Sequence, residues 1–235
     1  MTDEEKKDFL SGIDSLIAVF RENGPVSLDS SVDIEKVKLI VAKMAEISIC
    51  DESERKNFLE WMDSHEFWTS PASVRYHANF KGGLALHSLM VTYQALLFSR
   101  TFFEDFWHSK RADQYNFSAG DVFVASISHD FCKAASYTIE YRNTKNVQGN
   151  WVYTPHYKVK TELRNLGHGN ESVLNLIESM PSYIKKRPVL EAISRHMGFS
   201  DLSEYESYNY SNFLQNPLVI LIQTADQTAA NWFDC

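Results

Sequence analysis

Apolar residues recur at helical spacing in the first third of the chain. On one stretch they are Phe9, Ile13, Leu16, Ile17 and Phe20, and the pattern stops at Asn23-Gly24-Pro25. Residues three and four apart share one face of a helix, so this spacing predicts a first helix with an abrupt end. Similar patterns over residues 32–49 and 52–65 predict two more helices. We expect residues 1–66 to form an N-terminal helical segment that packs on the rest of the chain.

Residues 67–80 are rich in aromatic and small side chains and include Pro71, which indicates a loop that leads into Gly82-Gly83. A helix to about residue 100 follows. Ser118-x-x-Asp121 resembles a capping box, so we expect the next helix over about 119–137. Apolar patterns predict further helices over residues 170–180, about 188–197 and 217–232.

A different pattern interrupts these helices between residues 138 and 160. The β-favouring residues there are Tyr141, Val147, Trp151, Val152, Tyr153 and Tyr157, and Gln148-Gly149-Asn150 supplies a turn. The sequence therefore predicts an all-α helical bundle with a small β-hairpin insertion at about 138–160. Residues 67–235 form the main domain, and the whole chain is expected to be one compact unit.

The composition excludes several classes of protein. The chain has 235 residues, 44% of them hydrophobic, and a net charge of −8, which opposes a protein that coats long nucleic acids with a basic surface. Its three cysteines show no C-x-x-C spacing, so a disulfide framework and a thiolate zinc site are not indicated. No signal pattern or long apolar run is present, and we expect a cytoplasmic protein (in the host cytoplasm if phage-encoded) without membrane contact.

The most informative chemistry is His129-Asp130, an imidazole and a carboxylate side by side in an apolar stretch. A buried carboxylate costs several kcal/mol unless a partner satisfies it, and a cation does so well. A single histidine is more often structural than a ligand. Here, however, further candidates flank the pair at wide spacing: His87, His168, His196 and Asp226.

The order H…HD…H…H…D, with Lys133 completing an H-D-x-x-K string, resembles the HD superfamily of metal-dependent phosphohydrolases over about Phe67 to Asp226. Tyr76-His77 with Gly82-Gly83-Leu84 and His87-Ser88 is similar to the entry to the first ligand helix in bacterial HD hydrolases, including an exoribonuclease branch. Gly167-His168-Gly169 and Arg195-His196-Met197-Gly198 look like the extra histidines of two-metal members. Small bacterial and phage HD hydrolases are similar as well.

The resemblance implies an HD-domain helical bundle with one or two divalent ions, among them Mn²⁺, Fe²⁺, Co²⁺, Ni²⁺ or Mg²⁺. One ion would take His87, His129, Asp130 and Asp226. Asp130 would bridge to a second ion held by His168 and His196; with a single ion, these two would contact substrate or water instead.

Catalysis would rest on Asp130 and Lys133, because Lys133 follows the pair in helical register and can neutralise a phosphate. His77, Arg142 and Lys145 are the further substrate-binding candidates. Residues 138–164 carry a net charge of +3, from Arg142, Lys145, Lys158, Lys160 and Arg164 against Glu140 and Glu162. The hairpin is therefore expected to act as an electropositive lid, with aromatic residues available to stack on a base.

The preferred function is hydrolysis of a nucleotide or another small phosphoester by a metal-activated hydroxide. One alternative is a di-iron HD oxygenase that cleaves a small polyol or phosphonate with O₂. Another is a catalytically inactive HD protein that binds a nucleotide. The expected partner is a small anionic nucleotide or phosphoester, and the sequence leaves the oligomeric state open.

Overall fold

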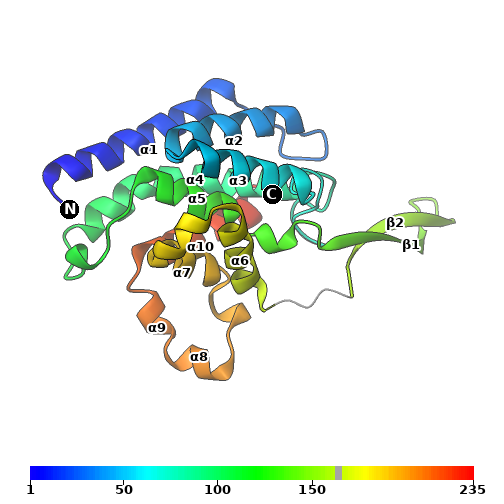
Figure 1. Cartoon of the computed structure of the whole chain (residues 1–235). Coiled ribbons are helices and arrows are strands. Elements are labelled where there is room, and N and C mark those ends of the chain that lie inside the picture. The colour runs from blue at the N-terminus through cyan, green and yellow to red at the C-terminus, as the bar shows by residue number, and fades with distance from the viewer. Residues whose placement is uncertain (162–165) are drawn as a thin grey trace.

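A long buried helix, α4 (Gly83–Phe106), forms the centre of the molecule. The structure is a computed structural model that describes residues 1–161 and 166–235. Helices α5 (Ala119–Ser128) and α10 (Pro217–Trp232) pack along α4 (Figure 1). The described chain is mostly helical with one small two-stranded sheet, as the sequence predicts.

Three N-terminal helices cover one side of this centre: α1 (Asp3–Asn23), α2 (Ile34–Ser48) and α3 (Glu52–Ser64). Each begins at a side chain that accepts backbone N–H groups, respectively Thr2, Asp33 and Asp51. The five apolar residues that predicted α1 are all buried. Helices α1 and α2 contact both α4 and α5, so the N-terminal helices and the central helices share one hydrophobic core.

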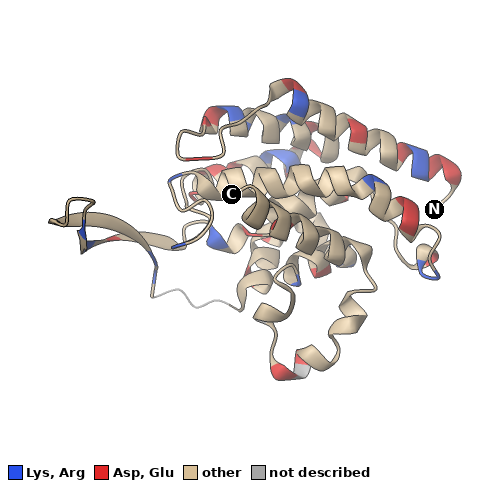
Figure 2. Ribbon diagram, turned by 180° about the vertical axis from the view of Figure 1, so that it is seen from behind, with Lys and Arg blue, Asp and Glu red and all other residues tan. Residues whose placement is uncertain are grey.

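The remaining helices follow the hairpin: α6 (His168–Ser179), α7 (Arg187–Ser194), α8 (Glu204–Tyr208) and α9 (Tyr210–Phe213). Helix α6 packs on α7, and α7 packs on α5 and α10. Figure 2 shows charged residues of both signs along α1 and α2 and few on the central helices. Within the described residues, no helix is both long and apolar enough to cross a membrane.

The Gly82-Gly83 pair fixes the start of α4. Gly82 has a φ of +86°, a left-handed conformation that favours glycine. At Gly83 a Cβ atom would lie 1.9 Å from the Ala78 carbonyl oxygen, so only glycine lets the preceding loop fold back on the helix. This packing places His87 in the second turn, on the buried side of α4.

The predicted helix over residues 119–137 is wrong in its second half. The Ser118–Asp121 capping box forms as predicted, but α5 ends at Ser128 and a 3₁₀ turn (Phe131–Lys133) replaces the rest. Phe131 anchors this turn by stacking on Trp61 at a ring-centroid distance of 4.4 Å. Aromatic packing therefore overrides the local helical pattern and turns the backbone at Asp130.

The predicted hairpin is confirmed. Strands β1 (Tyr137–Lys145) and β2 (Trp151–Val159) are antiparallel, with Tyr137 opposite Val159 and Lys145 opposite Trp151. Figure 1 shows that the two strands project from the helical body as an arm. The hairpin is therefore held mainly by its own pairing.

Candidate metal centre

Five separate parts of the fold bring the predicted ligands together. The side chains come from α4, from the turn after α5, from the first residue of α6, from the turn after α7 and from α10; they are His87, His129, Asp130, His168, His196 and Asp226. His87, His129 and His196 are at most 1% exposed, and so is Asp130. The buried histidines and aspartates form a cluster that can hold a metal ion.

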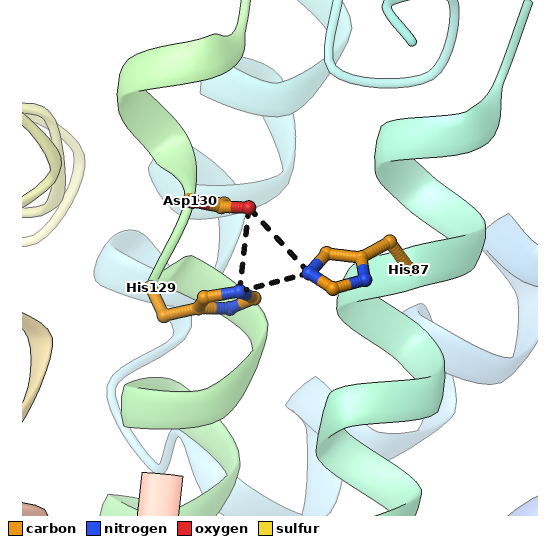
Figure 3. Close-up of side chains that lie close together, drawn as sticks. All are labelled: His87, His129 and Asp130. Carbon is orange, nitrogen blue, oxygen red and sulfur yellow. Dashed lines mark hydrogen bonds and ion pairs between the residues drawn. The ribbon is translucent and has the colours of Figure 1, made fainter. Parts of the chain in front are cut away.

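The innermost atoms of the cluster lie at close range. His87 Nε2 is 3.2 Å from His129 Nε2, and Asp130 Oδ2 lies 3.5 Å and 3.4 Å from these two nitrogens (Figure 3). Asp226 Oδ1 is 3.2 Å from His87 Nε2 and 3.9 Å from His129 Nε2. We call these four atoms the inner set.

Backbone carbonyl groups fix the protonation of the imidazoles. His87 Nδ1 lies 2.7 Å from the Cys235 carbonyl oxygen, and His129 Nδ1 lies 2.7 Å from that of Ser126. A carbonyl oxygen can only accept, so each Nδ1 carries the hydrogen and each neutral ring presents a bare Nε2 lone pair. Burial lowers the pKa of His129, which keeps that ring neutral.

Among themselves, the four inner-set atoms are hydrogen-bond acceptors that face one another, and the Lys133 ammonium reaches one of them, Asp130 Oδ2, at 2.6 Å. Such an arrangement is unfavourable in a buried site unless a positive charge lies among the atoms. Adjacent ligand atoms at about 2.0–2.2 Å from an ion lie roughly 2.8–3.6 Å apart in tetrahedral or octahedral geometry. The measured separations are close to this range, so the residues fit a divalent ion.

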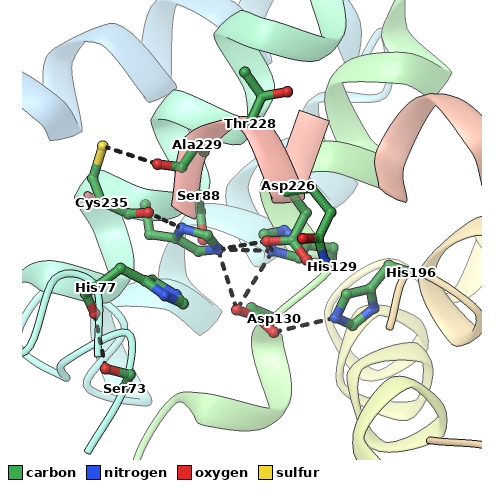
Figure 4. A network of polar contacts seen from close by, with 12 residues as sticks. Ser73, His77, Ser88, His129, Asp130, His196, Asp226, Thr228, Ala229 and Cys235 are labelled. Carbon is green, nitrogen blue, oxygen red and sulfur yellow. Dashed lines mark hydrogen bonds and ion pairs between the residues drawn. The ribbon is translucent and has the colours of Figure 1, made fainter. Parts of the chain in front are cut away.

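Asp130 connects the inner set to two further histidines. Its other oxygen, Oδ1, lies 2.6 Å from His168 Nε2 and 3.4 Å from His196 Nε2. Figure 4 shows Asp130 between His196 on one side and His87 and His129 on the other. His196 Nδ1 donates to the Ile193 carbonyl oxygen at 2.7 Å, and the buried Nε2 has no hydrogen-bond partner among the described residues. We call Asp130 Oδ1, His168 and His196 the outer set.

The Gly167-His168-Gly169 segment explains how α6 reaches the outer set. A Cβ atom at Gly169 would lie 2.2 Å from the Ser194 carbonyl oxygen, so glycine allows the start of α6 to touch the end of α7. The His168 and His196 rings consequently lie 5.1 Å apart. A motif read as a ligand pattern in the sequence is thus also a packing requirement.

Lys133 also contacts Asp130. Its Nζ lies 2.6 Å from Asp130 Oδ2, and its side chain is 16% exposed. Burial by itself favours the neutral amine, but the Asp130 charge raises the pKa of Lys133 above its ordinary value. In turn, although burial favours the protonated acid, the Lys133 charge and the hydrogen bond with His168 hold the pKa of Asp130 well below its usual range. The pair is therefore ionised at neutral pH.

An open cavity of about 620 Å³ leads from solvent to this cluster. Its walls are Arg75, Tyr76, His77, Asp130, Lys133, Met197, Asp226, Gln227, Ala230, Asn231 and Asp234. The ring of His77 lies 4.8 Å from that of His87, and burial lowers the pKa of His77 to about 4. His77 Nε2 is buried without a hydrogen-bond partner among the described residues, so it can bind a ligand in this cavity.

Two predicted substrate-binding residues lie elsewhere. Arg142 and Lys145 are on the hairpin and do not line the cavity; Arg142 contacts Glu140, and Lys145 Nζ lies 5.3 Å from the Trp151 ring centroid. Of the charges counted for the predicted lid, Glu162 and Arg164 lie outside the described residues.

Sequence reasoning missed several groups at the site. Arg75, Gln227 and Asn231 line the cavity, and the thiol of Cys132 lies within 4.8 Å of ligand atoms of Asp130 and His168. Gln227 and Asn231 lie one and five positions after Asp226, so the i+3 and i+4 register of a helix does not select them. The carbonyl of Cys235 had no detectable sequence pattern, because any residue supplies a carbonyl.

Comparison of the chain with protein-family models, with curated proteins and with solved structures finds no match. The functional argument therefore rests on the geometry of the candidate metal centre and on the ligand order in the sequence.

Proposed function

We propose that this protein is a metal-dependent phosphohydrolase of the HD type that acts on a nucleotide or another small phosphoester. The observation that carries the proposal is the inner set: four buried acceptor atoms that converge beside a lysine at the end of an open cavity. The ligand order and the H-D-x-x-K string, now seen to meet in space, favour the HD assignment.

The metal would be held by His87, His129, Asp130 and Asp226, and a second ion by the outer set. A bound divalent ion supplies Lewis acidity and lowers the pKa of a water molecule toward neutrality. The carbonyl acceptors at Nδ1 hold the rings of His87 and His129 with Nε2 toward the centre. Asp130 offers one oxygen to each set, which suits a bridging carboxylate.

Two cations of the chain line the cavity and suit an anionic substrate. Lys133 can move from Asp130 to a phosphoryl oxygen when a metal neutralises the carboxylate, and Arg75 lies at the exposed rim. His77 can donate from a neutral ring. None of these roles needs a serine or cysteine nucleophile.

The test is a substrate screen with reconstituted protein. Phosphomonoesters, nucleoside and deoxynucleoside triphosphates and cyclic nucleotides are incubated with Mn²⁺, Co²⁺, Ni²⁺, Fe²⁺ or Mg²⁺, and products are read by mass. We expect metal-dependent release of phosphate or a nucleotide product. Asp130→Asn, which keeps the shape of the side chain and removes its charge, serves as the inactive control.

Two outcomes contradict the proposal. O₂ uptake by the iron-loaded protein without phosphate release identifies an HD oxygenase, for which the same ligands serve. Tight nucleotide binding without turnover in any metal identifies a binding protein.

A further inference from the structure

The hairpin has one apolar and one polar face. Side chains alternate between the faces of a strand, so the pairing register fixes which residues share a face. One face combines alternate residues of both strands: Tyr137, Ile139, Tyr141, Asn143 and Lys145 with Trp151, Tyr153, Pro155, Tyr157 and Val159. We call it the aromatic face. The opposite face carries Thr138, Glu140, Arg142 and Thr144 with Val152, Thr154, His156 and Lys158.

The aromatic face is the more exposed of the two. Tyr153 and Trp151 are 67% and 68% exposed, and Ile139, Tyr141 and Val159 are between 50% and 56% exposed. Among the described residues, the one ring on which Tyr141 stacks is that of its diagonal cross-strand neighbour Tyr153, at a ring-centroid distance of 5.4 Å. No helix of the described chain covers these side chains.

The polar face, by contrast, is satisfied within the hairpin. Thr144 and Thr154 share a hydrogen bond of 2.8 Å, Thr154 and His156 one of 3.0 Å, and Lys158 Nζ lies 3.3 Å from Glu140 Oε2. An isolated two-stranded hairpin is marginal in water and needs packing on one face. The aromatic face is thus the surface that lacks a partner.

The chemistry of this face favours a protein partner over a nucleic acid. Lys145 is its only cation, and the Lys145 ammonium already lies over the Trp151 ring. Aliphatic Ile139, Pro155 and Val159 have no flat ring on which a base can stack. Mixed aromatic and aliphatic residues with few charges are typical of the buried centre of a protein interface.

We propose that the partner is a second copy of this chain, and that two hairpins pack aromatic face against aromatic face around a two-fold axis. The same apolar patch then covers itself, as in an isologous dimer. A fully covered aromatic side chain buries about 150–250 Å², so these half-exposed residues offer roughly 500 Å² per copy. The total of about 1,000 Å² lies just below the standard interface size, which predicts a concentration-dependent dimer.

This dimer has a consequence for the metal centre. Tyr137, at the base of the aromatic face, is the first residue of β1 and lies four positions after Lys133, whose ammonium contacts Asp130. When the hairpins of two copies pack around a two-fold axis, they run in opposite directions, so the tip of one lies above the base of the other. Lys145 at the tip would then approach the cavity of the second copy, which it does not reach in its own. This consequence rests on the proposed function, but the dimer does not.

Sedimentation equilibrium from about 1 µM to about 200 µM tests the dimer, since mass action makes its population depend on concentration. We expect the wild-type chain to dimerise and the double variant Trp151→Thr, Tyr153→Thr to stay monomeric. The matched control is Val152→Thr, which lies between these residues on the opposite face and should leave the dimer unchanged. Unchanged helical circular dichroism shows that the core of each variant is folded.

Cysteine crosslinking tests the face-to-face arrangement. Tyr141 is the middle residue of β1, so it lies near the proposed two-fold axis. With exposed Cys50 replaced by serine, Tyr141→Cys should oxidise to a covalent dimer and Arg142→Cys, on the polar face, should not.

A wild-type chain that is monomeric throughout the range overturns the proposal. So does a dimer that survives the double variant, or equal crosslinking from both cysteine positions. A monomer that binds a fluorescent oligothymidine through the aromatic face overturns it in favour of nucleic acid. All of these readouts are independent of enzyme activity and so of the proposed function.

Discussion

The candidate metal centre and the hairpin arm differ in which side chains they bury and in how many parts of the chain supply them. The centre gathers polar side chains from five distant parts of the chain and buries them, with His87, His129 and His196 at most 1% exposed. The arm comes from one continuous segment and exposes its aromatic residues, while its polar groups satisfy one another. In this molecule the interior holds the clustered histidine and aspartate side chains, and the projecting arm carries an exposed apolar surface.

The two regions should therefore respond differently to amino-acid substitutions. An inner-set atom is positioned by packing across the whole domain, so the loss of one charge there alters metal binding and stability together. A hairpin residue depends mainly on its cross-strand neighbours, so its loss stays local.

Asp130→Ala should abolish activity and lower the metal content more than any other single substitution, because Asp130 faces both sets. Elemental analysis and turnover with the best substrate measure the two effects. Asp113→Asn, at an exposed turn, is the control and should keep its metal. Full turnover in Asp130→Ala would contradict the proposal that Asp130 is a ligand of a catalytic metal ion.

Lys133→Ala should keep the metal content near that of wild type and lose roughly 2–4 kcal/mol of transition-state stabilisation, about the size of one electrostatic contact in an enclosed site. The measurement is kcat/KM beside metal content. Lys158→Ala, on the polar face of the hairpin, is the matched control. Loss of metal together with activity would show that Lys133 instead supports the position of Asp130.

His168→Ala and His196→Ala should each weaken the outer set and leave the inner set occupied, giving sub-stoichiometric metal. Because each change removes a proposed direct ligand, the affinity for the second ion should fall by more than the roughly 10- to 100-fold expected when only a supporting group is lost. Metal titration by calorimetry measures both sites. Anomalous scattering from one ion distant from both histidines would leave a single-metal centre.

Replacement of residues 143–154 with a short Gly-Ser bridge should leave the helical core and the metal intact, because no inner-set or outer-set atom lies in that span. Activity on the true substrate should fall mainly through a higher KM, while a generic activated phosphoester should be cut almost as before. Equal loss on both substrates, with metal retained, would mean that the arm positions the catalytic centre.

The smallest effect is a pH dependence of the metal-free protein. Burial lowers the pKa of His129, and lowers that of His77 to about 4. Below an ordinary histidine pKa of about 6.5, the unfolded chain binds protons that the folded chain does not, so stability is complete above this pH and falls as the pH falls. Since solvent screens the half-buried His77, we expect its contribution to fall by about 1 kcal/mol in all between about pH 6.5 and pH 4. Burial of His129 acts in the same direction.

Urea unfolding of chelator-treated protein at several pH values measures this slope. The arm-deleted variant retains His77 and His129 and should show the same slope as wild type. A stability that stays constant from about pH 7 to pH 5 would indicate that these rings take up protons in the folded state.

The sequence predicted most elements because their apolar spacing is local. The five buried residues of α1, the Asp226 helix and the hairpin turn at Gly149 can each be read within a short window. The helix through Asp130 was wrong because Phe131 packs against Trp61, a contact across 70 positions that no window contains. Tertiary packing decided the backbone there.

The ligands could be named in advance because their residue types are specific for the chemistry. Their geometry could not, since the convergence of Asp226 on His87 depends on how α10 packs along α4. The placement of Arg142 and Lys145 shows the same limit. Their charge favoured substrate binding, but a hairpin's direction relative to the domain is set by its junctions and not by its composition.

The hydrogen bond from His87 to the Cys235 carbonyl joins residues 148 positions apart in the chain. Such contacts form late in folding, because closing a long loop costs entropy before the contact can repay it. The inner set therefore does not exist until α10 and the residues after it have docked on α4. An ion held by the inner set would therefore bind the folded chain, and we expect it to slow unfolding more than it speeds folding.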